Sequence, residues 1–411
     1  MPKFLTLDDL GDVKGKRILV RPDFNVPLNP DTKEILDDSR IRAHAETIKE
    51  LSDKGARVVI IAHQGRPGQP DFLESLEKHA KKLSEILNRE VKYVHDLYGD
   101  EAKKAIKELK DGEILVLKNV RTFPEERKKK SPEEHAKSEL IKELAPLFDA
   151  FVLDGFSVAH RPHASVVGFA AVLPTYAGRV MEKELKGLSK ALEKPEKPLI
   201  VILGGAKAEK TVDIMKYFLE NNLADKILTG GLVSQLVVLA EGIDIGEPNV
   251  EYLKKKGLYD LVGPMKEIIE KYKGKIERPI DFAVEAEGKR LEIDISQLPT
   301  DKHIFDIGEK TIRKYKNEIK NAKTIIVSGP LGVYERDEFM KGTKEVFTAV
   351  AESGAYSIAG GGDTSAALAK IGVLEKYSYV SLAGGAFVEF ISGKKLPGVE
   401  VLEKWYEKLK G

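Results

Sequence analysis

The chain has 411 residues, of which 42% are hydrophobic and 32% charged, with 67 basic side chains balanced by 66 acidic ones. This composition is typical of a globular protein, and the length exceeds what one hydrophobic core usually organises, so we expect two domains. A formal net charge of +1 excludes a general attraction to nucleic acid, and we expect no such partner. The absence of cysteine excludes disulfides, thiolate metal sites and cysteine nucleophiles.

The amino-terminal segment and the apolar stretches bear on cellular location. The sequence MPKFLTLDDLG carries charges where a signal peptide needs an apolar core, and no apolar stretch reaches the length of a membrane span. We therefore expect a cytoplasmic protein with no membrane partner.

Short β-branched runs alternate with longer amphipathic segments along the chain. We expect strands at residues 17–20, 56–62, 113–117 and 149–154, and again at 198–203, 226–230, 323–328, 355–360 and 379–384. Continuous apolar runs indicate strands that are buried on both faces, as in parallel sheets covered by helices. The sequence therefore predicts an α/β fold with two Rossmann-like, three-layer domains.

An amphipathic segment at about residues 177–194 separates the two groups of strands. Its apolar residues, among them Met181, Leu185 and Leu188, recur at helical spacing, and the prolines of PEKP end the pattern. We predict a helical hinge that joins a domain of residues 1–172 to a domain of residues 173–393. The alternative is that this helix is one more crossover in a single large sheet.

Basic residues follow the strands of the first half. The segments are RPDFNVP (21–27), AHQGRP (62–67), KNVRTFP (118–124) and DGFSVAHRPHAS (154–165), and DDSRIRAH (37–44) opens a helix between the first two. In open α/β sheets, ligands bind beyond the carboxyl ends of the strands. A single arginine there is more often part of a surface salt bridge, but several at one edge are costly unless an anion binds.

We therefore predict an anion site formed by Arg40, Arg66, Arg121, Arg161 and His63. Planar guanidinium groups suit a small phosphate or carboxylate ligand, which they bind in a bidentate manner. Asp23 and Asn25 would accept from or orient the hydroxyl groups of this ligand.

Glycines follow the strands of the second half, in LGGAKAEK (203–210), TGGLVSQ (229–235), SGPLGVYE (328–335), AGGGDTSAAL (359–368) and LAGGAFVEF (382–390). Glycine between a strand and a helix lets backbone N–H groups approach phosphate oxygens, which predicts a nucleotide site. Neither a Walker loop nor the GxGxxG dinucleotide fingerprint is present, which disfavours a dehydrogenase. Asp363 is either a simple helix N-terminal acid or a residue that reaches a phosphate-bound Mg²⁺.

An anion site on one domain and a nucleotide site on the other favour a transferase whose substrates meet by domain closure. Phosphoryl transfer needs positioning, charge neutralisation and exclusion of water more than covalent help from the protein.

Seven motifs, in order and across almost the whole chain, resemble those of phosphoglycerate kinases: RPDFNVP, AHQGRP, KNVRTFP, AHRPHAS, GGAK, SGPLGVYE and GGGDT. Ser328 stands where the family commonly has Asn, residues 382–386 read LAGGA instead of TGGGA, and the segment after Lys207 is one residue shorter. These departures resemble the archaeal branch and leave the roles of Lys210 and Ser328 open. The closing segment, residues 394–411, resembles the one that returns to the first domain in this family.

The resemblance implies reversible transfer of a phosphoryl group from 1,3-bisphosphoglycerate to MgADP, giving 3-phosphoglycerate and MgATP in glycolysis and gluconeogenesis. The implied phosphoglycerate-binding residues are Asp23, Phe24, Asn25, Arg40, His63, Gln64, Gly65, Arg66, Arg121 and Arg161. The implied nucleotide-binding residues are Gly204, Gly205, Lys207, Glu335, Gly362, Asp363, Thr364 and Ser365. Arg40 would face the transferring phosphoryl group and Lys207 the nucleotide phosphates, so both are expected to be catalytic.

The resemblance further implies that Glu335 contacts the ribose and that Asp363 lies near the Mg²⁺ that accompanies ATP or ADP. Attack would be direct and in line, without a protein nucleophile or general base. A monomer or a homodimer is expected. Two alternatives are a non-catalytic nucleotide or phosphoglycerate sensor on the same fold, which the presence of Arg40, Lys207 and Asp363 disfavours, and a kinase of another carboxylate.

Overall fold

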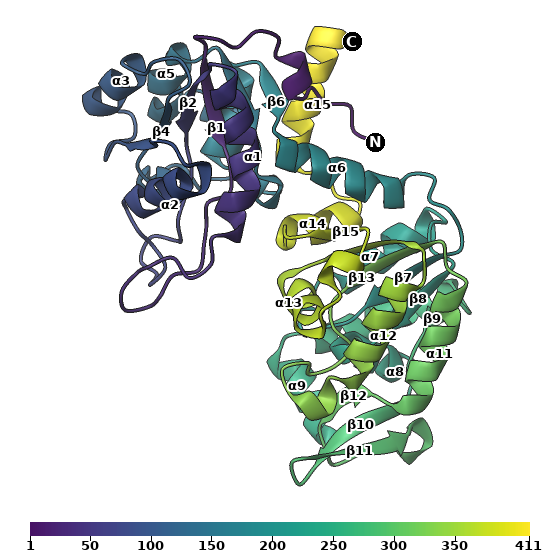
Figure 1. Cartoon of the computed structure of the whole chain (residues 1–411). Helices are drawn as coiled ribbons and strands as arrows, with labels where there is room; N and C mark the ends of the chain where they lie inside the picture. Colours follow the sequence, from purple (N-terminus) through teal and green to yellow (C-terminus); the bar gives the residue numbers. More distant parts are fainter. The chain divides into compact units, whose positions relative to one another are not determined.

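The computed structural model describes residues 1–411 and divides into two compact units. The first unit comprises residues 1–186 and 395–411, and the second comprises residues 187–394. Each unit contains its own six-stranded parallel sheet (Figure 1). The predicted α/β fold with two parallel sheets is confirmed, and the alternative of one large sheet is wrong. The ligand-binding roles given to the two domains remain predictions.

The sheet of the first unit has the strand order β3-β4-β2-β1-β5-β6. Its strands are β1 (Arg17–Arg21), β2 (Arg57–Ile60), β3 (Lys92–Tyr93), β4 (Ile114–Val116), β5 (Ala150–Leu153) and β6 (Thr175–Ala177). Ile18, Leu19 and Val20 are consecutive in β1 and are all fully buried. Because neighbouring residues of a strand point to opposite faces, helices must cover both faces of this sheet, as the continuous apolar runs predict.

The helices of the first unit are α1 (Ser39–Asp53), α2 (Glu77–Leu87), α3 (Asp100–Lys107), α4 (Pro132–His135) and α5 (Glu139–Leu144), with the start of α6 (Arg179–Leu192) and all of α15 (Pro397–Lys410). In α1, Ile41, Ile48 and Leu51 lie at helical spacing and are buried, which fixes the face that packs on the sheet. Helix α15 lies beside β6 (Figure 1), and the Trp405 indole donates a 2.6 Å hydrogen bond to the Ala170 carbonyl.

The parallel sheet of the second unit has the strand order β15-β14-β13-β7-β8-β9. These strands are β7 (Leu199–Leu203), β8 (Lys226–Thr229), β9 (Ile276–Glu277), β13 (Thr324–Ser328), β14 (Tyr356–Gly360) and β15 (Tyr379–Ser381). The helices are α7 (Thr211–Glu220), α8 (Gly231–Ala240), α9 (Glu247–Lys255), α10 (Val262–Lys271), α11 (Glu309–Lys320), α12 (Lys341–Glu352), α13 (Gly362–Ile371) and α14 (Gly385–Ile391). All nine strands expected from the sequence are present.

A small antiparallel sheet, which the apolar runs do not predict, forms one end of the second unit (Figure 1). It contains β10 (Asp281–Ala286), β11 (Lys289–Asp294) and β12 (Ile304–Ile307). Strands β10 and β11 form a hairpin whose turn residues, Glu287 and Gly288, both have positive φ angles. Two consecutive residues with positive φ are typical of the type I′ turn that joins tight hairpins.

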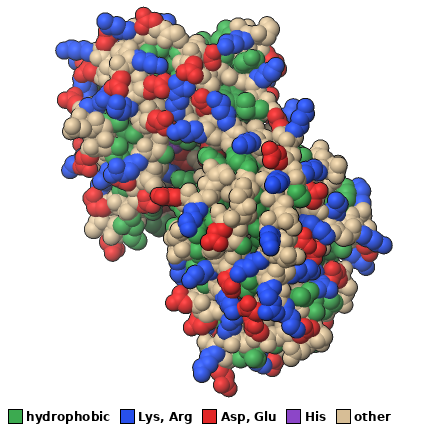
Figure 2. Space-filling view, turned by 45° about the vertical axis from the view of Figure 1, so that its right-hand side comes forward, with side chains coloured by type: hydrophobic (Ala, Val, Ile, Leu, Met, Phe, Trp, Pro, Cys, Tyr) green, Lys and Arg blue, Asp and Glu red, His purple; other side chains and the backbone are tan.

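Charged side chains of both signs are interspersed on the surface shown in Figure 2. This agrees with the balanced composition, and many of these groups form ion pairs between neighbouring helical turns, such as Lys49 with Asp53. None of the helices combines the length and the apolar character needed to span a lipid bilayer.

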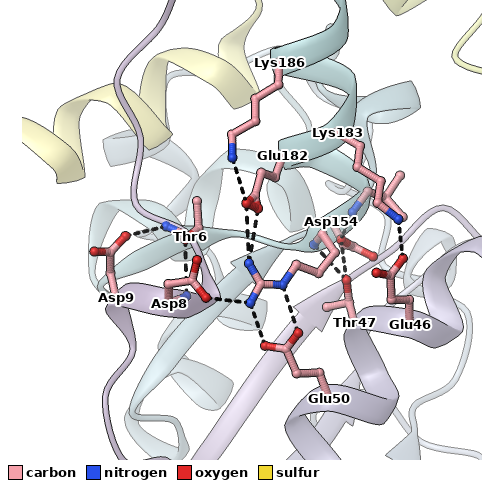
Figure 3. Close-up of polar contacts among 12 residues, drawn as sticks. Thr6, Asp8, Asp9, Glu46, Thr47, Glu50, Asp154, Glu182, Lys183 and Lys186 are labelled. Carbon is pink, nitrogen blue, oxygen red and sulfur yellow. Dashed lines mark hydrogen bonds and ion pairs between the residues drawn. The ribbon is translucent and has the colours of Figure 1, made fainter. Parts of the chain in front are cut away.

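Arg179 secures the first turn of α6 to the first unit. Figure 3 labels its three carboxylate partners, Asp8, Glu50 and Glu182. Its guanidinium group donates hydrogen bonds to Glu50 at 2.9 Å, to Asp8 at 2.8 Å and to Glu182 at 3.2 Å. The hydrogen bonds from Arg179 to Glu50 and Asp8 raise the pKa of the Arg179 side chain. The side chain is only 17% exposed, so water screens these contacts less than it screens surface ion pairs.

We predict that Arg179→Met lowers the free energy of unfolding by about 1–3 kcal/mol, because charge-assisted hydrogen bonds to three carboxylates are lost. Urea denaturation of the full chain measures this change. Lys183→Met is the matched control on the same helix, since Lys183 forms one exposed ion pair with Glu46 and should contribute less than about 0.5 kcal/mol. Equal effects of the two substitutions would contradict the role given to Arg179.

Candidate active site

The predicted anion-binding residues lie at the carboxyl ends of four neighbouring parallel strands, at one edge of the first sheet. Asp23, Phe24 and Asn25 follow β1; His63, Gln64, Gly65 and Arg66 follow β2; Arg121 follows β4; and Arg161 follows β5, while Arg40 lies in the first turn of α1. Strands β4, β2, β1 and β5 are adjacent in the sheet. The fold therefore gathers segments that are far apart in the sequence at one edge.

Arg40 and Asp23 form an ion pair at this edge, with 3.0 Å between Nη1 and Oδ2. Arg40 also donates to the Asn25 carbonyl at 2.9 Å, and Ser157 donates to Asp23 at 2.5 Å. Burial on its own raises the pKa of the Asp23 carboxyl, but the charge of Arg40 and the hydrogen bonds from Ser157 and Asn25 hold that pKa well below its usual range. Asp23 is therefore ionised, and its ion pair holds the Arg40 guanidinium group at the edge.

His63 is held in one tautomer by Arg21, a residue that the sequence analysis does not include among the site residues. Arg21 Nη2 lies 3.0 Å from His63 Nδ1. Since a guanidinium group can only donate, Nδ1 accepts and the ring proton is on Nε2. Burial and the charge of Arg21 hold the pKa of His63 well below its usual value, so the ring is neutral and Nε2–H is a donor.

Arg21 is itself fully buried and depends on a buried acid. It donates from Nε to the Ser165 hydroxyl at 2.9 Å, and Ser165 donates to Glu126 at 2.7 Å from both its hydroxyl and its backbone N–H. Glu126 is completely buried, and this burial raises the pKa of its carboxyl while the charge of Arg21 opposes the rise. The chain Glu126–Ser165–Arg21–His63 thus orients the imidazole of His63.

The side chains of Gln64, in the β2 loop, and Phe24, in the β1 loop, are both engaged inside the protein. The Gln64 amide donates to the carbonyls of Val26 and Asp71 and accepts from the backbone of Val26 and from His79. This uses its whole hydrogen-bonding capacity inside the protein, and the Phe24 ring is likewise buried in the core. Gln64 and Phe24 therefore support the loop, and neither side chain can contact a ligand while it keeps these contacts.

Gly65 joins the β1 and β2 loops to β4. Its N–H donates to Asn25 at 2.8 Å, and its carbonyl accepts from Arg121 at 2.8 Å. Its φ angle is +70°, and an added Cβ would collide with the backbone of Asp71. Glycine is required here because a side chain would be both strained and blocked.

The three outer arginines differ in their surroundings. Arg121 is buried, its Nε has no hydrogen-bond partner, and burial together with the charges of Arg21 and Arg161 lowers its pKa to about 10. Arg161 is half-buried, and its charge lowers the pKa of both Arg121 and His163. The guanidinium of Arg66 is exposed. The edge carries a net positive charge, because these arginines outnumber the buried acids Asp23 and Glu126.

A second histidine, His44 of α1, positions the backbone of Asp23. The Asp23 N–H donates to His44 Nε2 at 3.1 Å, so the ring proton is on Nδ1, which donates to Asp154 at 2.6 Å. Asp154 also accepts from Thr47 and from the Val180 backbone at the start of α6. Figure 3 shows Asp154 and Thr47 beside the Arg179 contacts. A buried hydrogen-bonded path therefore connects the first turn of α6 to Asp23.

The second unit contains a pocket of about 500 Å³ at the carboxyl ends of its central strands. Three predicted nucleotide-binding residues line it: Gly205, Glu335 and Asp363. The pocket also has walls that the sequence analysis misses, formed by Asn249 and Tyr252 of α9 and by residues 303–306 around β12. No glycine motif marks these walls, because they belong to the small antiparallel sheet and its neighbouring helix.

Backbone packing around the pocket explains part of the glycine pattern. An added Cβ at Gly204 would collide with the Pro330 carbonyl, and Gly329, at φ +98°, lies against the Gly204 carbonyl. The Thr364 hydroxyl is buried and accepts a 2.8 Å hydrogen bond from the Gly329 N–H. Thr364 therefore ties the β13 loop to α13, which is a structural role for its side chain.

Helix α13 follows Gly361, which gives no side-chain cap, so the first N–H groups of α13 are available for an anion. In α8 the first two N–H groups, those of Gly231 and Leu232, donate to the carbonyls of Leu331 and Gly205. Gly362 opens α13, and the Ser365 hydroxyl donates to the Gly362 carbonyl. Lys207 and Lys210 are exposed in the loop after β7. Lys207, Lys210, Gly362 and Ser365 lie in segments next to the pocket but do not line it.

The residues present fit a magnesium ion that arrives on nucleotide phosphates. Mg²⁺ prefers one or two carboxylates together with phosphate oxygens and water. No group of three acidic or histidine side chains that could hold a metal ion exists in the structure. Asp363 lines the pocket together with Glu335 and with Asp306, which is paired with Arg290. The donor set thus suits an ion held mainly by the nucleotide.

The sequence profile of phosphoglycerate kinase matches residues 7–394. The chain belongs to the phosphoglycerate kinase family. The phosphoglycerate kinase of Methanothermobacter thermautotrophicus is 45% identical over 98% of this chain and 97% of that protein, and that of Methanococcus maripaludis is 46% identical over 99% and 100%. The crystal structure of phosphoglycerate kinase from Pyrococcus horikoshii OT3 superposes with a TM-score of 0.89, at 40% identity, over 98% of this chain and 100% of that one.

Membership of the phosphoglycerate kinase family confirms the predicted enzyme class and reaction. The chain is a phosphotransferase that uses a carboxyl group as acceptor. The predicted resemblance to the archaeal branch is also confirmed, since the relatives reported above are archaeal.

We predict that His44→Ala raises the KM for 3-phosphoglycerate about fivefold, because the hydrogen bond that holds the Asp23 backbone, worth about 1 kcal/mol, is lost. The hydrogen bond from His44 to Asp154 is lost as well, which should lower the free energy of unfolding. Initial rates at varied 3-phosphoglycerate and varied ATP measure the change in KM. The KM for ATP should stay within twofold of its starting value, since no nucleotide-site residue contacts His44. A parallel rise in both KM values would instead indicate general damage to the fold.

Proposed function

We propose that the arginine-rich edge of the first unit binds 3-phosphoglycerate and that the pocket of the second unit binds ATP or ADP. The observation that carries this proposal is the positive charge of the edge, where the sheet brings together Arg40, Arg66, Arg121 and Arg161. Such a site is electrostatically costly when empty and favourable with a multiply charged anion.

At the first site, Arg66, Arg121 and Arg161 would hold the phosphate of phosphoglycerate, and His63 would donate from Nε2. Asn25 and Asp23 would meet the ligand hydroxyl, because the Asp23 carboxylate, which has about four lone-pair positions, keeps one acceptor position beyond its contacts with Arg40, Ser157 and Asn25. Phe24, Gln64 and Gly65 would shape the loop and present backbone groups.

At the second site, the phosphates of the nucleotide would lie against the N-terminus of α13, where Gly362, Asp363 and the Ser365 region present backbone N–H groups. Lys207, with Gly204 and Gly205 beside it, would approach the phosphates from the β7 loop, and Glu335 would accept from the ribose hydroxyls. When bound, Mg²⁺ would neutralise phosphate charge, with Asp363 as its protein contact.

The carboxylate of 3-phosphoglycerate is itself a competent nucleophile, so the reaction needs no protein nucleophile. The protein's contribution is to orient the two ligands in line and to neutralise the charge of the transferring phosphoryl group, through Arg40 from one unit and Lys207 from the other. Neither unit holds both sites, so the two units must bring their ligands together. We place this activity in the cytoplasm, in a monomer or a homodimer.

We predict that Arg40→Ala lowers kcat by at least about a hundredfold while the protein stays folded, because a cation at the transferring group is lost. Turnover of 3-phosphoglycerate with MgATP, coupled through glyceraldehyde-3-phosphate dehydrogenase to loss of NADH, measures kcat. Arg42→Ala is the matched control, since Arg42 is on the same helix and pairs with Asp38 at the surface.

Near-normal turnover of folded Arg40→Ala would remove Arg40 from the catalytic residues. No turnover by the unsubstituted enzyme, with both ligands still binding, would favour the sensor. Efficient turnover of another carboxylate in place of 3-phosphoglycerate would favour the second alternative, a kinase with a different acceptor.

A further inference from the structure

The small antiparallel sheet of the second unit packs against the segment that carries Glu335. The Val333 N–H donates to the Phe305 carbonyl of β12 at 2.8 Å. An added Cβ at Gly332 would come within 2.6 Å of that carbonyl oxygen and of Asp306 Oδ1, so the backbone of the β13 loop passes directly against β12. The sheet therefore holds this loop just before Glu335, which lines the nucleotide pocket.

The side chain of Arg336, the residue after Glu335, is held by the same sheet and by a nearby aromatic pair. Its guanidinium group forms an ion pair with Glu285 of β10. The same group lies over two rings, at 5.5 Å from the centroid of Phe305 and 4.9 Å from that of Phe339, and these rings meet edge to face. An ion pair and two cation–π contacts therefore hold this guanidinium group in one place.

Arg290 of β11 fastens the chain to the sheet a few residues further on. It donates from Nη1 to the Glu338 carbonyl at 3.0 Å and to the buried Asp306 carboxylate at 2.7 Å. Asp306 also accepts from the Gly342 N–H of α12 at 2.9 Å. The chain is therefore bound to the antiparallel sheet on both sides of Glu335.

Glu335 contributes an exposed carboxylate from this fixed stretch of chain. Ordering a mobile backbone when a ligand binds costs conformational entropy, whereas a backbone that is already fixed does not incur this cost. The contacts that fix the backbone around Glu335 therefore raise the affinity for any ligand group that its carboxylate binds.

We propose that Arg336 is a positioning residue of the nucleotide site, which fixes Glu335 in the place where its carboxylate accepts from the ribose hydroxyls. This inference rests on the proposed contact between Glu335 and the ribose. Arg336 is not among the residues that line the pocket, so it acts through Glu335 and not on the nucleotide itself. Loss of the Arg336 contacts should weaken the ribose contact and spare the phosphate contacts of α13 and the β7 loop.

Calorimetric titration of the full chain with ADP and with 2′,3′-dideoxyadenosine diphosphate, which lacks both ribose hydroxyls, isolates the ribose contact. The unsubstituted enzyme should bind ADP about tenfold more tightly, as expected for a hydrogen bond to a carboxylate. Arg336→Met keeps an unbranched side chain but removes the charge. It should reduce the ratio of the two affinities to about threefold or less by weakening ADP binding, and leave the affinity for the dideoxy nucleotide within about twofold.

Arg278→Met is the matched control, since Arg278 pairs with Glu241 at 2.7 Å elsewhere in the second unit. It should preserve the ratio of the unsubstituted enzyme, and Arg336→Lys, which retains a positive charge for Glu285, should keep most of it. A folded Arg336→Met enzyme with the unsubstituted ratio overturns the proposal. A ratio near one in the unsubstituted enzyme would instead remove the ribose contact of Glu335, and the role of Arg336 would fail with it.

Discussion

The guanidinium group of Arg21 is buried at the carboxyl end of β1, and its charge has to be balanced within the protein. Glu126, acting through Ser165, provides the balance, and the remaining donors of Arg21 fix His63 in its neutral form. Arg121 lies close enough to Arg21 and Arg161 that their charges, together with its burial, lower the pKa of Arg121. The buried acids of the first unit thus hold Arg21 and Arg40 in place, and the outer arginines Arg66, Arg121 and Arg161 add further positive charge to the edge.

The sequence predicts the central strands of both sheets because these strands are buried on both faces and so consist of continuous apolar residues. The strands β3 and β9 have only two residues each, which is too short for any pattern to emerge. In the β10–β11 hairpin, β10 has only three consecutive apolar residues, Phe282 to Val284, whereas β11 alternates apolar and polar residues and exposes Leu291. The clearest sequence signal for this hairpin is the Glu287–Gly288 pair at its turn.

The candidate site was predictable where parallel strands bring their carboxyl ends to one edge, which is why Arg121 and His63 could be grouped without coordinates. Roles that depend on long-range partners were not predictable. Gln64 stands among ligand-binding residues in its motif, yet its amide is fully engaged by Val26, Asp71 and His79.

The central claim is that the charge of the first unit's edge selects a phosphorylated acid. Calorimetric titration of the full chain with 3-phosphoglycerate and, separately, with glycerate tests it most directly, since the two ligands differ only in the phosphate. We predict that 3-phosphoglycerate binds at least about a hundredfold more tightly, because several guanidinium contacts to the phosphate are lost with glycerate. Added salt should reduce this difference in affinity. Equal affinities for the two ligands, or a difference insensitive to salt, would contradict the claim.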